Sequence, residues 1–203
     1  MVILTPNLLI SVGTRDTYRH PQDPCKCLKI EKTHAHYSKR RKRFYDKNLS
    51  HNELDLKNYS ILKPHLIKYI PYCEDTLVET NLGKAFCSEL IVDQDQTPSE
   101  CILDYLLSNT PIPDQILSQL TELLELIRQK SLFIFDLNPK NFLIKKSSHS
   151  QYHLKFIDFK SLNLNKSLIP MEKIPIFARG KLKRRIKRLK KWINHSENQE
   201  GQL

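Results

Sequence analysis

The sequence is poor in the features that mark fibrous, disulfide-rich and membrane-spanning proteins. Four glycines among 203 residues are too few for a collagen-like or glycine-rich chain. The five cysteines include no Cys-x-x-Cys pair, so neither a disulfide framework nor a zinc ribbon is predicted. No apolar run approaches the roughly 20 residues of a membrane-spanning helix, and the N-terminus lacks the basic region and cleavage site of a secretory signal. We expect a globular protein in the reducing cytoplasm.

The first 92 residues have the pattern of several strands and one helix. Alternating or β-prone residues predict strands at Leu8–Tyr18, Cys25–Ile30, Tyr69–Tyr72, Thr76–Thr80 and Lys84–Val92. The polar, basic stretch 31–47 predicts a loop. Ser50 and Glu53 then have the spacing of a capping box, which predicts a helix over His51–Leu62.

The rest of the chain has mostly helical patterns. A short helix is expected to end at Leu107, and Asp114–Lys130 carries apolar residues at i, i+3 and i+4, which indicates an amphipathic helix. Phe142–Lys146 and His153–Ile157 predict a hairpin. We therefore divide the chain into a β-rich lobe at 1–92, a hinge at 93–97, a helical lobe at 98–193 that ends in a basic helix, and a disordered tail at 194–203.

One motif points to phosphate chemistry. Residues 136–141 read Asp-Leu-Asn-Pro-Lys-Asn, which resembles the Asp-Leu-x-x-x-Asn catalytic loop of protein kinases. Asp158-Phe159 follows the predicted hairpin, as the metal-binding Asp-Phe-Gly motif does in those enzymes. Asp, Asn and Pro also form ordinary turns, so a helix-to-strand turn is the alternative interpretation of 136–141. The aspartate downstream favours a nucleotide site.

Phosphoryl transfer explains why these residue types are needed. A triphosphate concentrates negative charge, so a kinase-like site for ATP and Mg²⁺ needs a cation on the phosphates and oxygen ligands on the metal. We expect Lys29 to contact the phosphates and Glu53 to hold Lys29. Asn141 and Asp158 are expected to bind Mg²⁺, and Asp136 to orient or deprotonate the acceptor hydroxyl.

Several of these residues also have simpler interpretations. Lys29 alone would be a typical solvated strand lysine. Glu53 can merely cap its helix, and Asp55 is a rival acid nearby. Cys27 lies two residues before Lys29 on the same strand face and is therefore expected to line the nucleotide pocket. Cys27 and Cys25 also suit the role of small buried hydrophobic residues.

The sequence resembles the family of the PhoP regulatory network protein YrbL over roughly residues 8–193. The resemblance is carried by Val12-Gly-Thr14, Lys26-Cys-Leu-Lys29-Ile30, Asn52-Glu-Leu54, Val78-Glu-Thr80, Leu137-Asn-Pro-Lys-Asn-Phe-Leu143 and Trp192. It implies a reduced two-lobed protein-kinase-like fold of the α+β class. An N-terminal antiparallel sheet with one helix would precede a smaller helical C-terminal lobe. It also implies a bacterial regulatory setting.

The chain departs from the kinase pattern in ways that bear on activity. The glycine-rich phosphate loop is reduced to Gly13, and Lys160 stands where Asp-Phe-Gly has its glycine. Asn138 replaces the lysine that usually contacts the transferred phosphoryl group. These departures leave open whether the protein is a phosphotransferase or a pseudokinase. Only 45 residues follow Asp158, so we expect the acceptor to be a small molecule or one dedicated protein.

The positive charge is concentrated near the C-terminus. Nine Lys or Arg residues lie within residues 179–191 without an acid, and removing them from the net charge of +11 leaves +2 elsewhere. Apolar residues recur there at helical spacing: Leu182, Ile186, Leu189 and Ile193. The stripe favours packing on the lobe. The charge suggests an alternative function for residues 179–193, binding nucleic acid, acidic lipid or an acidic protein.

Overall fold

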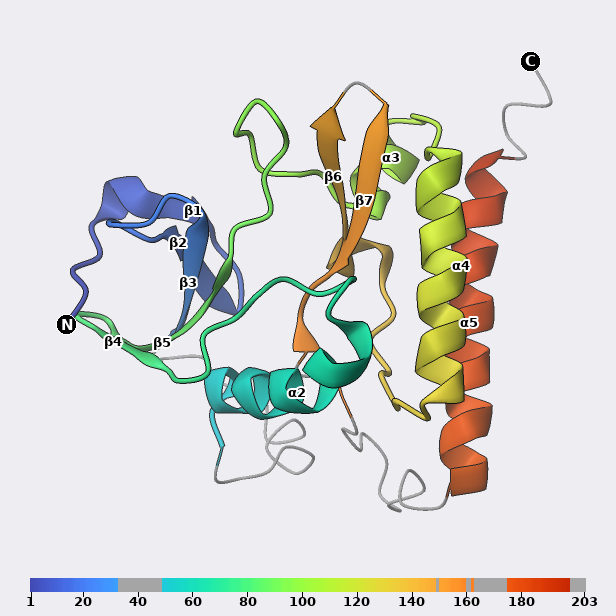
Figure 1. The fold of residues 1–203 in the computed structure, drawn as a ribbon, viewed down its shortest axis with the longest axis horizontal. Coiled ribbons are helices and arrows are strands. Elements are labelled where there is room, and N and C mark those ends of the chain that lie inside the picture. The colour runs from blue at the N-terminus through green and yellow to red at the C-terminus, as the bar shows by residue number, and fades with distance from the viewer. Residues whose placement is uncertain (33–48, 149, 160–161, 163–174, 198–203) are drawn as a thin grey trace. The chain divides into compact units, whose positions relative to one another are not determined.

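A computed structural model describes residues 1–32, 49–148, 150–159, 162 and 175–197 (Figure 1). The chain divides into two compact units. Unit 1 comprises Met1–Ile67 and Pro71–Leu90, and unit 2 comprises Lys68–Ile70 and Ile91–Leu203. Within the described ranges, no helix has the length and apolar character needed to cross a bilayer.

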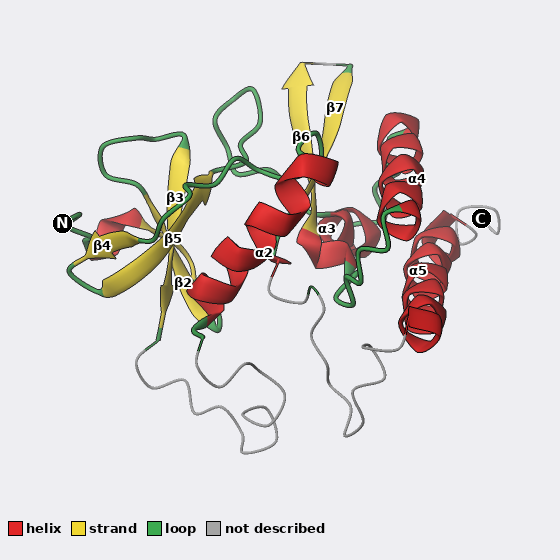
Figure 2. Ribbon diagram, turned by 60° about the horizontal axis from the view of Figure 1, so that its bottom comes forward, coloured by secondary structure: helices red, strands yellow, loops and turns green. Residues whose placement is uncertain are grey.

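Unit 1 is built on a five-stranded antiparallel sheet (Figure 2). A 3₁₀ turn at Pro6–Leu8 precedes it, and its strands in spatial order are β1 Leu9–Ser11, β2 Arg15–Arg19, β3 Lys26–Glu31, β5 Gly83–Glu89 and β4 Val78–Thr80. Leu28 and Ile30 of β3 pack with Ala85 and Cys87 of β5 on one face of the sheet, against Leu4. Because side chains alternate along a strand, the residues between them face the other side.

Two strand predictions in unit 1 were wrong. Leu8–Tyr18 is two strands rather than one, because the chain reverses around Gly13. Tyr69–Tyr72 forms no strand, and the nearest pairing is an isolated bridge between Cys73 and Ser88. The remaining three strands are present, with β4 and β5 shorter than predicted.

Helix α2, His51–Leu66, begins with the predicted capping box and runs one turn further than expected. Its buried residues include Leu54, Tyr59 and Leu62. The predicted loop at 31–47 lies almost entirely outside the described residues.

Unit 2 combines helices with a hairpin. Its elements are α3 Ile102–Leu107, α4 Asp114–Gln129, a 3₁₀ turn at Pro139–Asn141, β6 Phe142–Ser148, β7 Gln151–Phe156 and α5 Pro175–Glu197. The predicted amphipathic helix and the predicted hairpin are both confirmed. Gln119 of α4 donates to the carbonyl of Tyr152 and accepts from the amide of Leu154, so α4 covers the outer edge of β7.

The order of elements confirms the predicted α+β class, with an N-terminal antiparallel sheet and one helix followed by a mainly helical unit. Residues 93–97, proposed as a hinge, form a turn within unit 2 in which the amide of Gln96 donates to the carbonyl of Asp93. Of the tail predicted at 194–203, residues 194–197 belong to α5, and residues 198–203 lie outside the described residues.

Candidate functional site

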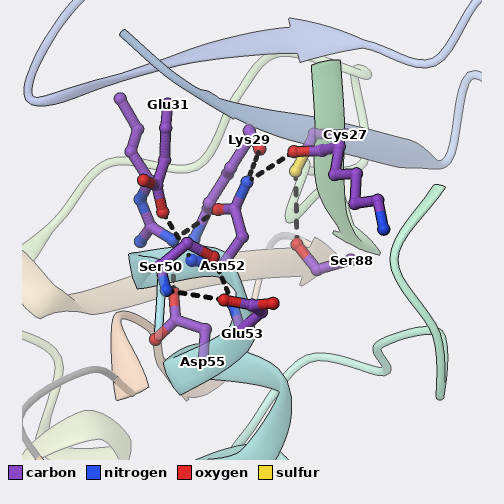
Figure 3. A network of polar contacts seen from close by, with 10 residues as sticks. Cys27, Lys29, Glu31, Ser50, Asn52, Glu53, Asp55 and Ser88 are labelled. Carbon is purple, nitrogen blue, oxygen red and sulfur yellow. Dashed lines mark hydrogen bonds and ion pairs between the residues drawn. The ribbon is translucent and has the colours of Figure 1, made fainter. Parts of the chain in front are cut away.

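In unit 1, β3 carries two of the predicted nucleotide-binding residues. Lys29 pairs with Thr17 on β2 and Phe86 on β5, and its Nζ lies 6.0 Å from the centre of the Phe86 ring. Cys27, two residues earlier, is buried, with its Sγ 3.4 Å from Ser88 Oγ (Figure 3). Lys29 is half-buried. The ammonium group therefore lies on the sheet face opposite the core formed by Leu28 and Ile30.

Asn52 fastens the first turn of α2 to the sheet. Its Nδ2 donates to the carbonyls of Lys29 and Lys84, at 2.9 Å each, and its Oδ1 accepts from Arg15 Nη1 at 3.0 Å. One side chain that is 1% exposed thus joins α2 to β2, β3 and β5 (Figure 3). Because Asn52 binds the backbone carbonyl of Lys29, it fixes the position of the Lys29 backbone relative to α2.

A buried ion pair lies next to this amide. Arg15 Nη1 is 2.6 Å from Asp55 Oδ2, and the two side chains are 6% and 0% exposed. Burial raises the pKa of the Cys73 thiol, which the positive charge of Lys29 opposes and the negative charge of Asp55 reinforces. Lys29 and Asp55 therefore both act on the same buried thiol.

Sequence reasoning did not identify Arg15 or Asn52 as site residues, and it named Asp55 only as a rival of Glu53. No local sequence pattern could have identified the Arg15–Asp55 ion pair, because its members come from a strand and a helix that are distant in the sequence. The only available signal was polar character at positions that the strand and helix patterns assign to the interior.

Glu53 completes the capping box of α2. Its carboxylate accepts from the amide of Ser50 at 2.6 Å, and its own amide donates to Ser50 Oγ at 3.1 Å. The backbone hydrogen bond from Ser50, followed by that of the Ser50 hydroxyl, lowers the pKa of Glu53, against partial desolvation. Its proposed contact with Lys29 stays a prediction. Gly13 lies exposed in the turn between β1 and β2.

In unit 2, the loop that follows α4 is held in shape by its own backbone. The carbonyl of Asp136 accepts from Asn138 N at 2.9 Å and from Asn141 Nδ2 at 3.0 Å. The carbonyl of Asn141 in turn accepts from Ile157 N at 2.8 Å. Asn141 is 4% exposed. Residues 136–141 are therefore tied directly to the segment that carries Asp158.

Asp158 has an unusual backbone conformation. Its φ is 69°, in the left-handed region, where a residue other than glycine costs on the order of 1–3 kcal/mol and Asp less than most. Phe159 next to it is 2% exposed and packs at 6.1 Å from Phe156, which in turn lies 5.2 Å from Phe142. This aromatic cluster anchors the chain on both sides of the strained residue.

Asn141 and Asp158 carry the type of oxygen atom that binds magnesium. The hydrogen bond from Asn141 Nδ2 to the Asp136 carbonyl turns Asn141 Oδ1 the other way, where it can accept or ligate. Mg²⁺ is commonly held by one or two protein oxygens together with phosphate oxygens and water. Asn141 and Asp158 can supply such a set. Within the described ranges, no three His, Cys, Asp or Glu side chains form a metal-binding group.

Comparisons with known proteins point to one family. A family model described as "PhoP regulatory network protein YrbL" matches residues 2–194. No curated protein matches the sequence.

Solved structures of the PknI kinase domain from Mycobacterium tuberculosis are similar to this chain. A point mutant aligns with a TM-score of 0.46 and 18% identity over 75% of this chain and 58% of that one. The unmutated domain aligns with a TM-score of 0.41 and 15% identity over 72% and 54%. This chain thus spans less than two thirds of the length of those kinase domains.

Proposed function

The chain belongs to the family of the PhoP regulatory network protein YrbL, and on that premise we propose that it binds ATP together with Mg²⁺ in the manner of a protein kinase. The observation that carries the proposal is the loop in unit 2. There the buried side-chain amide of Asn141 donates to the Asp136 carbonyl, and the main-chain carbonyl of Asn141 accepts from the amide of Ile157, next to the strained Asp158. Strain at a polar residue is a feature that clusters at functional sites.

Each residue has one role in this proposal. Asn141 Oδ1 and the Asp158 carboxylate would hold Mg²⁺, which would neutralise charge on the phosphates, and Lys29 would contribute a further positive charge. Asp136 accepts the proton of an acceptor hydroxyl. The hydroxyl oxygen then bonds to the γ-phosphorus as the bond to the ADP oxygen breaks. The acceptor is a small molecule or one dedicated protein.

Nucleotide binding is tested by thermal unfolding with and without millimolar ATP and Mg²⁺. We expect ATP with Mg²⁺ to raise the melting temperature of the wild type and to leave that of Asp158→Asn almost unchanged, because the variant lacks the metal-binding charge. Asp75→Asn is a matched control, because its side chain is 75% exposed and pairs only loosely with Lys63 at 3.5 Å. The proposal would be contradicted if ATP with Mg²⁺ did not change the melting temperature of the wild type, or if it raised that of Asp158→Asn equally.

Catalysis is tested separately from binding. Asp136→Asn keeps the backbone carbonyl that Asn141 binds but removes the proton acceptor. If the protein is an enzyme, the variant should retain the ATP-dependent stabilisation and lose phosphate release or transfer by at least about 100-fold. If the wild type itself transfers no phosphate although ATP stabilises it, the protein is a pseudokinase.

A further inference from the structure

Helix α5 presents a dense row of positive charge on the side away from its packing face. Ala178, Leu182, Leu189 and Ile193 are buried, each 4% exposed or less, and α5 lies beside α4 in both views (Figures 1 and 2). Successive residues turn by about 100° around the axis. Five exposed residues consequently point away from that stripe, and we call them the cationic face: Lys183, Arg184, Lys187, Arg188 and Lys191.

The charges of the cationic face are not balanced within the part of the chain that the structure describes. Lys183, Lys187 and Lys191 follow one another at intervals of four residues, about 6 Å along the axis. Like charges at this spacing repel. None of the five forms a salt bridge with a described acidic residue.

Lys190 differs from the cationic face because it lies closer to the packing side. The pKa of Glu125 on α4 is lowered to about 2, first by the hydrogen bond from Arg128 and then by that from Gln129, and the charge of Lys190 adds to this effect. The charge of Lys190 therefore acts on an acid of its own unit. Lys190 provides a matched control for the five residues of the cationic face, which form no salt bridge with a described acidic residue.

We propose that the cationic face binds the phosphate backbone of a nucleic acid. A straight row of same-sign charges spaced by a few ångströms matches a polymer that carries one negative charge per phosphate. Binding such a polymer releases its condensed counterions and relieves the repulsion along α5. RNA and DNA share this chemistry, and the cationic face carries no feature that distinguishes between them.

The structure disfavours the two other anionic partners. A membrane-surface helix inserts its apolar stripe into the bilayer, whereas the stripe of α5 is buried in unit 2. Its exposed aromatic residues, Phe177 and Trp192, lie about 22 Å apart along the axis and form no continuous apolar surface. Protein interfaces need a well-packed apolar or aromatic centre. The middle of the cationic face contains only Lys and Arg.

The test measures binding of the full-length protein to short fluorescent RNA and DNA duplexes by anisotropy across a series of salt concentrations. We expect affinity to fall steeply with salt. The double variant Lys187→Gln/Arg188→Gln should bind at least about 10-fold more weakly and reduce the slope of log K against log salt by about two units. Lys190→Gln should change both values much less. The ratio of the affinities for the RNA and the DNA duplex shows which of the two nucleic acids the protein prefers.

The melting temperature shows whether weaker binding by the double variant is caused by unfolding. Because both side chains are exposed and their removal relieves repulsion, the melting temperature of the double variant should equal or slightly exceed that of the wild type. The proposal is overturned if neither duplex binds at low salt, or if Lys190→Gln weakens binding as much as the double variant. Tighter binding to anionic vesicles or to polyglutamate than to either duplex would also overturn it, in favour of a lipid or an acidic protein.

Discussion

In unit 1 two buried charged side chains pair with each other, whereas in unit 2 the buried side chain of Asn141 binds the backbone. Arg15 pairs with Asp55, and Asn52 links that pair to the sheet. In unit 2, Asn141 instead shapes the loop around the Asp136 carbonyl, and the backbone at Asp158 is held in a strained conformation. A buried ion pair is needed by the fold because the loss of one partner leaves the other charge unpaired, whereas backbone strain lowers stability. We infer that the unit 1 network mainly positions Lys29, and that the chemistry belongs to the unit 2 loop.

The largest expected effect tests the unit 1 side of this comparison. Asp55→Asn leaves Arg15 buried without its counter-charge, and breaking a buried pair in this way costs about 3–5 kcal/mol. The free energy of unfolding, from urea titration, should fall by that amount. Asp75→Asn breaks an exposed pair and should cost less than about 1 kcal/mol.

A second variant separates charge from packing. Arg15→Met/Asp55→Leu removes both charges from the buried site and should recover much of the stability lost in Asp55→Asn, because neither charge is left unpaired and only the hydrogen bond from Arg15 to Asn52 Oδ1 is lost. If this stable double variant also retains the ATP-dependent thermal shift, the ion pair serves the fold alone. If the shift is lost while stability returns, the pair positions Lys29 for the nucleotide.

The two networks also differ in how far the sequence could predict them. The loop at 136–141 and the capping box at Ser50 are local patterns, so the hydrogen bonds that shape them follow from residues a few positions apart. The Arg15–Asp55 pair and the contacts of Asn52 join segments distant in the sequence, and only the packing of α2 against the sheet brings them together.

The same contrast explains the errors in secondary structure. The apolar stripe of α4 extends over four turns and was predicted almost to the residue. Strand β1 has three residues, too few to show an alternation of its own, so the sequence pattern does not separate β1 from β2 at the turn that contains Gly13. Tyr69–Tyr72 is apolar and β-prone, but it makes only single backbone hydrogen bonds to strands, from Phe156 N to Tyr69 O and from Glu89 N to Tyr72 O, and these form no ladder.

A smaller effect separates the helix cap from the proposed contact with Lys29. Glu53→Ala removes the side-chain half of the capping box and should cost about 1 kcal/mol at neutral pH, whereas Glu53→Gln keeps the hydrogen bond to Ser50 and should cost less. An equal loss of the ATP-dependent thermal shift in both variants would show that the charge also serves the nucleotide.

The pH dependence of Glu53→Ala follows from the lowered pKa of Glu53. Because the folded-state pKa lies below its ordinary value of 4.5, the ionised carboxylate stabilises the protein above that pH. This contribution is lost as the pH falls through the folded-state pKa. The stability difference between wild type and Glu53→Ala should therefore shrink between about pH 7 and about pH 3, as measured by urea titration at each pH. A constant difference would assign the effect of Glu53 to packing.

The smallest expected change in stability tests the strain in unit 2. Ser131 follows α4 with a φ of 51°, and Ser131→Gly should stabilise the protein by about 0.5–1 kcal/mol, because glycine adopts this conformation without strain. Asp158→Gly relieves the same kind of strain at a φ of 69° but also removes a carboxylate that has contacts of its own. It should leave the free energy of unfolding within about 1 kcal/mol of the wild type and abolish the ATP-dependent thermal shift. A large loss of stability in Asp158→Gly, with Ser131→Gly stabilised as expected, would mean that Asp158 supports the fold, and the contrast between the two units would fail.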